Sequence, residues 1–234
     1  MNMIEADQRQ PAGRQINVKH LFFTILLLGL LLLRPLLPSA IVDAIFVPGM
    51  ILAAWLAGGR TRRSLIVTVI AGGAALALLA FDLVAHEQFR AMIRQPLGFA
   101  VTFAAIGLLV YCGGVIMHSL LTAERIFIDE IIGTFNIYLI MGYVWSYIYI
   151  LVELVSPGSF HPPTPEDALG IRFIYFSFIT LTTVGFGDTV PVSPMAQMLV
   201  IFEAIMGQFY VAVVVAYLVS MYITHNLAAR KPDD

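Results

Sequence analysis

The sequence contains few charged residues. Only 12% of its 234 residues are charged, whereas soluble domains average roughly a quarter. This deficit excludes an ordinary water-soluble enzyme and a disordered tail protein. Acidic and basic residues nearly balance at a net charge of −2, so we expect no nucleic-acid partner. The single cysteine, Cys112, cannot form an intrachain disulfide, and we expect it to pack as an apolar group.

Patterns that would indicate a metal site or an enzyme are also missing. The five histidines are dispersed along the chain without the spacing of metal ligands. The sequence has no phosphate-binding loop and no arrangement of a nucleophile with a base. We therefore expect no cofactor and no enzymatic activity.

Long apolar runs are abundant, since 59% of the residues are hydrophobic. A helix that spans a membrane needs about 20 mostly apolar residues, and the charges cluster so that several gaps reach this length. The sequence thus predicts an all-α membrane protein with six spanning segments, at residues 20–37, 40–57, 64–84, 97–120, 131–155 and 194–223.

The apolar run from Phe173 to Gly187 is different, because it is too short to cross the roughly 30 Å hydrocarbon core as a helix. A segment that enters the membrane and returns fits it better. Such backbone is tolerated at membrane depth only where it is buried in protein or lines a watery cavity.

Six spans place both termini on the same side of the membrane, and most basic residues fall on that side. This asymmetry predicts that both termini are cytoplasmic, in a multi-pass protein of the cell (plasma) membrane. The basic residues on that side are Arg9, Arg14, Lys19, Arg60, Arg62, Arg63, Arg125, Arg230 and Lys231.

The segment from Thr180 to Asp188 reads Thr-Leu-Thr-Thr-Val-Gly-Phe-Gly-Asp. Its part from Thr183 to Asp188 resembles the selectivity filter of potassium channels, in the variant with phenylalanine. The resemblance covers the last two spans and the segment between them. It implies that K+ binds to the carbonyl oxygens of Thr183, Val184, Gly185 and Phe186, together with the Thr183 hydroxyl, in a homotetramer.

The residue types suit this chemistry. A potassium ion sheds its water only if other oxygens replace it, and rings of backbone carbonyls can do so. Successive carbonyls face the same way only if ordinary and positive φ values alternate along the strand. Gly185 and Gly187 can adopt positive φ without steric cost.

Helix start signals flank the filter on both sides. Thr164 and Pro165, followed by two acids, predict a helix that runs to about Thr182 and directs its negative end at the pore. Ser193 and Pro194 repeat the signal at the start of the last span.

The last span resembles the inner helix of potassium channels. Gly207 stands at the position of the hinge glycine of bacterial members, 24 residues after Thr183. The resemblance and helical spacing predict a hinge and pore lining formed by Gly207, Gln208, Val211, Val215, Ala216 and Val219.

The resemblance also places filter-supporting residues and shows two departures. Thr182, Asp188 and the pair Tyr175 and Phe176 are expected to brace the filter. The first departure is that Phe186 replaces the commoner tyrosine. The second is Ile179, which stands where some members have a glutamate facing the aspartate, so Tyr175 is the donor expected for Asp188.

The first four spans resemble a voltage-sensor domain in number only. A voltage sensor needs several arginines in its fourth helix, and the span at 97–120 has none, so we expect no intrinsic voltage gating. The predicted organisation is an N-terminal segment, a four-helix domain, an interfacial linker, a pore domain and a short tail, at residues 1–19, 20–121, 122–130, 131–223 and 224–234.

Two further features remain open. Glu203 lies inside the last span and could sense pH or support the pore helix from behind, but we favour a position near the outer interface in contact with water. The run Tyr143, Trp145, Tyr147 and Tyr149 predicts an interfacial belt that also packs against the pore helix.

The function expected from the sequence is passive, potassium-selective conduction across a lipid membrane. The alternative is an accessory or sensory membrane protein that keeps a pore-like fold without conducting. In that alternative, an unidentified regulatory partner would bind the first four helices.

Overall fold

The computed structural model describes residues 18–36, 48–49, 87–122, 128–163 and 168–228. These residues are mostly helical, with one short pair of strands. The elements are α1 (Val18–Leu33), α4 (Glu87–Leu121), α5 (Ile128–Val155), β1 (Phe160–His161), α6 (Leu169–Leu181), β2 (Val190–Pro191) and α7 (Pro194–Ala228).

Three of the described helices are long and apolar enough to cross a membrane. They contain the segments Gly98–Leu121, Ile131–Val155 and Pro194–Val214, which correspond to the predicted fourth, fifth and sixth spans. Helix α4 also extends before its predicted span, since it begins at Glu87 and continues through Pro96. The predicted second and third spans lie outside the described residues, except for residues 48–49.

Helix α1 is shorter than the span predicted at 20–37. It has 16 residues and ends at Leu33, followed by a turn in which the Leu36 N–H donates to the Leu33 carbonyl. The physical reason is Pro35, which disfavours helical backbone at the residue before it.

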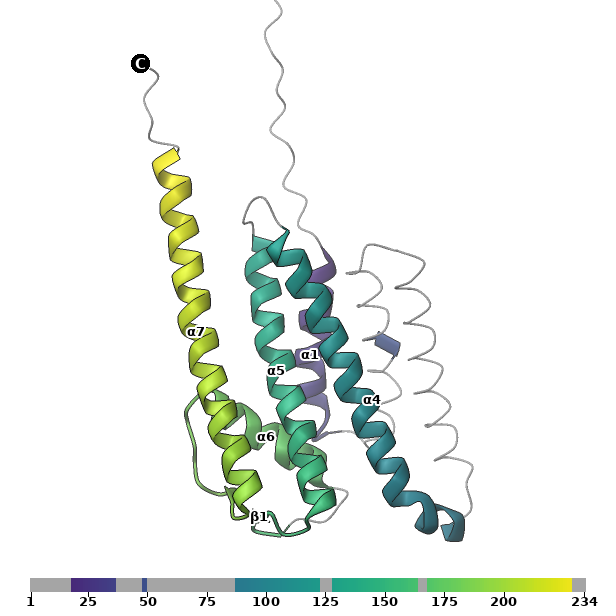
Figure 1. Ribbon diagram of the computed structural model, residues 1–234. Coiled ribbons are helices and arrows are strands. Elements are labelled where there is room, and N and C mark those ends of the chain that lie inside the picture. Colours follow the sequence, from purple (N-terminus) through teal and green to yellow (C-terminus); the bar gives the residue numbers. More distant parts are fainter. Residues whose placement is uncertain (1–17, 37–47, 50–86, 123–127, 164–167, 229–234) are drawn as a thin grey trace, which may run out of the picture.

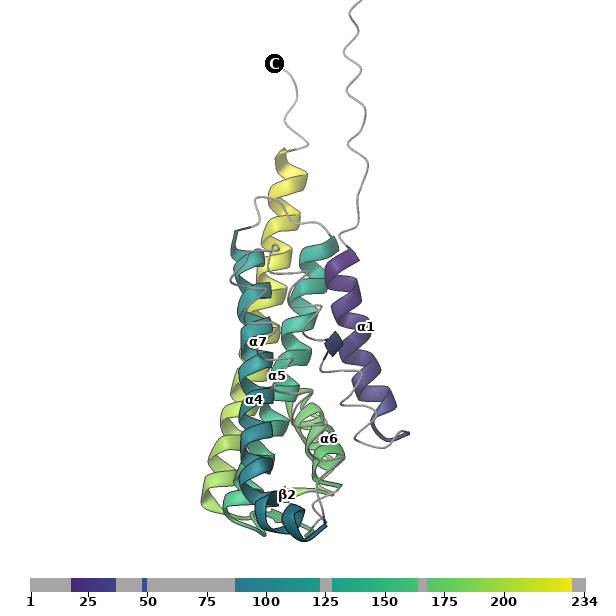
Figure 2. The same cartoon turned by 90° about the vertical axis from the view of Figure 1, so that its right-hand side faces the viewer.

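Helix α5 lies at the centre of the described structure. Figure 1 shows α7 on one side of it and α1 and α4 on the other, while the short helix α6 lies near one end. Figure 2 shows α6 from the side, next to the same end of α5. The strands β1 and β2 pair antiparallel at this end, a pairing that the sequence did not predict.

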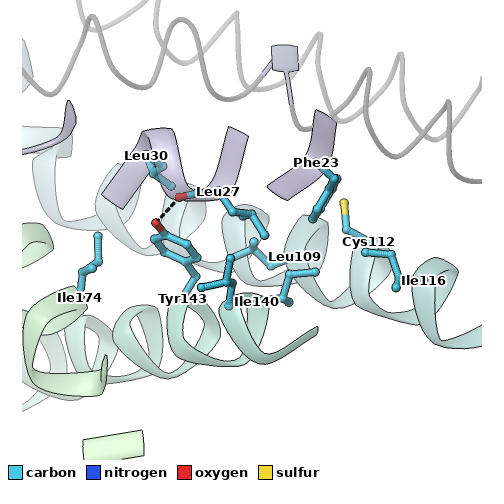
Figure 3. Close-up of a cluster of buried hydrophobic side chains, with 10 residues drawn as sticks. Phe23, Leu27, Leu30, Leu109, Cys112, Ile116, Ile140, Tyr143 and Ile174 are labelled. Atoms are coloured by element: carbon cyan, nitrogen blue, oxygen red, sulfur yellow. Dashed lines mark hydrogen bonds between the residues drawn. The ribbon is translucent and has the colours of Figure 1, made fainter. Parts of the chain in front are cut away.

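One buried cluster joins α1, α4, α5 and α6 (Figure 3). Cys112 is buried in it, as predicted, and the hydroxyl of Tyr143 donates a hydrogen bond of 2.8 Å to the Leu27 carbonyl. The cluster consists of Phe23, Leu27, Leu30, Leu109, Cys112, Ile116, Leu139, Ile140, Tyr143 and Ile174.

Buried polar groups also connect α1 to α5. The Thr24 hydroxyl lies 2.7 Å from Asn136 Oδ1, and Asn136 Nδ2 donates a 3.0 Å bond to the His20 carbonyl. All three residues are buried. Helix α1 is therefore held on α5 by directional bonds as well as by packing.

A second buried cluster places α6 against α5 and the start of α7. Tyr149 stands at its centre, with ring contacts to Phe160, Phe173 and Phe176. The predicted packing of the aromatic run against the pore helix is therefore present at Tyr149. The cluster consists of Trp145, Tyr149, Phe160, Leu169, Phe173, Phe176, Ile179 and Ala196.

Candidate ion-conducting site

Helix α6 is a short apolar helix of 13 residues between the two last spans. It ends at Leu181, one residue before the predicted end at Thr182. Its described part begins at Leu169, and the predicted start signal at residues 164–167 lies outside the described residues. Thr182 closes the helix, because its N–H and its hydroxyl both donate to the Phe178 carbonyl, at 3.0 and 2.6 Å.

The segment from Thr183 to Gly187, hereafter the strand, follows α6 and is not helical. The sign of its backbone φ alternates from residue to residue. Thr183, Gly185 and Gly187 have φ values of 59°, 51° and 76°, while Val184 and Phe186 between them lack positive φ. The positive φ predicted for both glycines is present. The positive φ of Thr183 was not predicted, because threonine rarely adopts this conformation and nothing in the local sequence marks it.

The N–H groups at the start of this strand point back to the helix. Those of Val184 and Gly185 both donate to the Ile179 carbonyl, at 2.9 and 3.1 Å. Within the described part of the chain, no hydrogen bond ends on the carbonyls of residues 183–186. The strand therefore has its first amides engaged and its carbonyl oxygens available for another partner.

Within the single chain, only one of the two residues Tyr175 and Phe176 contacts the strand. The Tyr175 ring is stacked on Phe186, with centroids 6.5 Å apart and planes 5° apart, and its hydroxyl is hydrogen-bonded to Asp188. Phe176 is buried against Tyr149 of α5, with ring centroids 5.3 Å apart. Neighbouring residues of a helix point about 100° apart, so only Tyr175 faces the strand.

Glu203 lies behind α6 and not at the outer interface. Its side chain is fully buried, and its two carboxyl oxygens are hydrogen-bonded to the hydroxyls of Tyr149 on α5 and Ser177 on α6. The expectation that Glu203 contacts water was therefore wrong. The physical reason is that two other helices each bring a hydroxyl group to its carboxyl, a coincidence that only the packing of α5 and α6 creates.

A polar group near the paired strands β1 and β2 was missed by the sequence analysis. The Glu153 carboxylate accepts bonds from the N–H groups of Gly158 (2.7 Å) and Phe160 (3.2 Å), which fixes the loop after α5. Arg172 of α6 donates from Nε to Thr189 Oγ1 at 3.4 Å and interacts electrostatically with Glu153 and Asp188. These contacts connect α5 and α6 to the chain that follows the strand.

The last span begins where the sequence predicted. Helix α7 starts at Pro194, and the Ser193 hydroxyl caps it by accepting a 3.2 Å bond from the Ala196 N–H. It continues as a single helix through Gly207, which is buried against Leu181 of α6.

The other predicted lining positions lie further along α7. Gln208, Val211 and Ala216 are exposed in the single chain. Val215 and Val219 belong to the same helix, but their side chains lie outside what the structure describes.

A short helix, followed by a non-helical strand and held between two apolar spans, defines the pore-loop class of membrane proteins. Residues 134–224 match the family described as ion channel (Ion_trans_2). This range includes most of α5, all of α6 and the strand, and α7 as far as residue 224. This part of the chain is therefore similar to the ion channel domains of multi-pass membrane proteins.

A curated protein is also similar to this part of the chain. The inward rectifier potassium channel Kirbac3.1 of Paramagnetospirillum magnetotacticum is 34% identical over 101 residues. The alignment covers 41% of this chain and only 30% of that relative, so the chain spans less than a third of the relative's length. No solved structure matches the chain at a comparable significance.

Proposed function

We propose that this protein is a potassium-selective channel through which K+ moves passively. Four copies of the chain surround one axis, and each contributes the strand from Thr183 to Gly187. The carbonyls of Thr183, Val184, Gly185 and Phe186, with the Thr183 hydroxyl, replace the water of the ion. The similarity to a potassium channel in the comparison above supports potassium as the ion.

The observation that carries the proposal is the alternation of φ at Thr183, Gly185 and Gly187. Successive carbonyls that turn to one side can form stacked rings around an axis, which is how K+ is coordinated in such filters. The bonds from the Val184 and Gly185 amides to the Ile179 carbonyl support it, because they direct these amides toward α6.

Large apolar side chains that are exposed in the single chain support a homotetramer. Along α7, Phe202 is 61% exposed and Phe209 is 68% exposed, and Phe186 of the strand is 70% exposed. Lipid covers apolar side chains at the outside of such an assembly, and neighbouring copies cover the remainder. One strand from one chain cannot close a ring, so cyclic symmetry completes the site.

The inner helix would form the cavity below the filter. Apolar residues that narrow a cavity can close it by dewetting. In this arrangement, Gly207 is the hinge beside the cavity, and the lining consists of Gln208, Val211, Val215, Ala216 and Val219.

The remaining organisation follows the distribution of charges. The pore domain is residues 131–223. A voltage sensor needs several arginines in its fourth helix, and the predicted fourth span at 97–120 has none. The channel is therefore not intrinsically voltage-gated. It lies in the plasma membrane with both termini in the cytoplasm.

Ion flux from liposomes tests the selectivity. Purified protein should release K+ down its gradient but not Na+, and Ba2+, which competes for filter sites, should block the flux. Equal passage of Na+ and K+ would contradict the selectivity. An intact tetramer without any flux would instead favour the non-conducting accessory protein, whose partner would be sought on the first four helices.

A matched pair of glycine variants tests the filter itself. Gly185→Ala and Gly158→Ala each place a side chain at positive φ, at +51° and +83°, a strain of roughly 1–2 kcal/mol. No described residue lies within 4 Å of a Cβ built at either position. We expect Gly185→Ala to abolish K+ flux while the tetramer forms, and Gly158→Ala, in the outer loop, to conduct. Unchanged flux in Gly185→Ala would contradict the filter assignment.

A further inference from the structure

Glu203 connects three helices at one point behind the filter. It belongs to α7. Its Oε2 accepts a hydrogen bond from the Tyr149 hydroxyl of α5, and its Oε1 is hydrogen-bonded to the Ser177 hydroxyl of α6. The side chains of Glu203, Tyr149 and Ser177 are at most 1% exposed. The carboxyl group is therefore a buried polar contact that joins α7 to both α5 and α6.

The number of hydrogens at Ser177 restricts the protonation state of this group. The Ser177 Oγ lies within hydrogen-bond distance of Glu203 Oε1 and also 2.8 Å from the Gly142 carbonyl of α5. A serine hydroxyl has a single hydrogen and two lone pairs. If Ser177 donates to Gly142, it can only accept from Glu203, and Glu203 must then carry the proton.

A neutral carboxylic acid satisfies every group in this chain of bonds. Tyr149 donates to Oε2, Oε1–H donates to Ser177, and Ser177 donates to the Gly142 carbonyl. If Glu203 were a carboxylate, the single Ser177 hydrogen would be donated to it. The Ser177 Oγ and the Gly142 carbonyl oxygen, 2.8 Å apart, would then have no hydrogen between them. Partly satisfied buried polar networks are costly, whereas fully satisfied ones stabilise one arrangement.

Among the described residues, no basic side chain forms an ion pair with Glu203. Helices α5 and α7 contain no lysine or arginine, and the arginine of α6, Arg172, lies at Thr189. The other titratable groups that face Glu203 are the hydroxyls of Tyr149 and Tyr138, both on α5. An ionised carboxyl at membrane depth without a cationic partner is expensive.

We propose that Glu203 is a neutral carboxylic acid that locks α6 between α5 and α7 and thereby positions the filter strand. This inference rests on the proposed function for its effect on ions, although the protonation and the lock do not depend on conduction. Glu203 is a positioning residue, since it acts on the filter through α6.

The path from Glu203 to the filter is short. Ser177 lies two residues before Ile179, whose carbonyl holds the amides of Val184 and Gly185. A shift of α6 would move this carbonyl and with it the strand. The close approach of the helices makes the lock possible, because a Cβ built at Gly142 would be only 2.6 Å from Phe178 Cζ.

Substitutions of Glu203 distinguish a neutral carboxylic acid from a charged carboxylate at this position. In Glu203→Gln, the amide oxygen can accept from Tyr149 and the amide group can donate to Ser177, so the neutral pattern is retained. Glu203→Ala removes both bonds. The affinity of the purified tetramer for K+ is measured by titration calorimetry in which K+ replaces Na+. We expect this affinity to stay within about twofold of the wild-type value in Glu203→Gln. We expect it to fall by about eightfold in Glu203→Ala, which corresponds to the average free energy of two interhelical hydrogen bonds if that free energy is fully coupled to K+ binding.

Ser177→Ala and Tyr149→Phe provide the same test if Glu203→Ala does not assemble. Each removes one link of the lock while keeping most of the side-chain volume. Each should weaken K+ binding by an intermediate factor, with the tetramer intact by mass measurement in detergent. Wild-type K+ affinity in Ser177→Ala, Tyr149→Phe and Glu203→Ala alike would overturn the positioning role.

Infrared spectroscopy tests the protonation without reference to conduction. The wild-type protein at neutral pH should show the carbonyl stretch of a protonated carboxylic acid, and the band should be absent in Glu203→Gln. A wild-type spectrum without this band would overturn the neutral state, as would an equal loss of K+ affinity in Glu203→Gln and Glu203→Ala. If the wild-type protein shows the band but neither binds nor passes K+, the proposed function fails and the protonated lock stands.

Discussion

Gly207 of α7 lies directly against Leu181, the last residue of α6. A Cβ built at Gly207 would be 2.9 Å from Leu181 Cδ2, 3.2 Å from its carbonyl oxygen and 3.4 Å from its Cα. Two of these three atoms belong to the backbone, which cannot rotate away. Packing therefore requires a small residue at this position, whether or not it also serves as the predicted hinge. Glycine allows α7 to approach the end of α6, close to the strand that begins at Thr183.

We expect Gly207→Ala to destabilise the assembled protein even though alanine favours a helix by about 1 kcal/mol over glycine. Overpacking against fixed backbone costs typically 1–3 kcal/mol, so the net effect should be a lower thermal midpoint of the tetramer and a lower K+ flux. Gly113→Ala in α4 is the control, because its Cβ would meet Ile140 Cγ2 at an ordinary 3.6 Å. A Gly207→Ala tetramer as stable as the wild type would contradict this packing role.

The bond between Tyr175 and Asp188 is expected to hold the outer end of the filter strand. Tyr175→Phe removes the hydroxyl and keeps the ring that stacks on Phe186. It should make K+ current decline faster during sustained conduction, measured in planar bilayers. Asp188→Asn weakens the same bond, so Tyr175→Phe should add little to it in the double variant. Two independent effects that sum in the double variant would show that the residues are not coupled.

The polar contact between α1 and α5 should contribute measurably to stability. Thr24→Val and Asn136→Leu each break the bond between Thr24 and Asn136, and interhelical bonds in membranes are worth about 0.6 kcal/mol on average. Asn136→Leu should cost more, because it also removes the bond to the His20 carbonyl. Unfolding in mixed detergent micelles measures both effects.

Thr102→Val is the matched control for this contact. The Thr102 hydroxyl donates only within α4, to the Gly98 carbonyl at 2.7 Å, so its loss should leave the unfolding free energy nearly unchanged. Equal effects of Thr24→Val and Thr102→Val would indicate that the contact between α1 and α5 adds no stability.

Local sequence signals predicted local structure well. The cap formed by Ser193 with Pro194 marks the start of α7, and the two glycines at 185 and 187 mark positive φ, because each effect depends on one residue and its immediate neighbours. The same reasoning missed the early end of α1 at Leu33, although Pro35 gives the signal. It also missed the positive φ of Thr183, for which the strand has no comparable signal.

Contacts between helices were predicted less well in this way, although the packing of Tyr149 against α6 was expected. Tyr175 and Phe176 were expected to act together, but the packing of α6 on α5 turns one to the strand and buries the other. Glu203 was expected near water, but it is buried behind α6.

The sequence by itself determined the class of this protein. The scarcity of charge, the lengths of the apolar runs and a short filter-like motif are properties of composition and order along the chain, and they require no knowledge of which helices touch. Only the tertiary structure decided that Glu203 bonds to Tyr149 and Ser177, residues 54 and 26 positions away. A carboxyl group at membrane depth takes its state from the donors that packing brings to it, and the chain encodes those donors on separate helices.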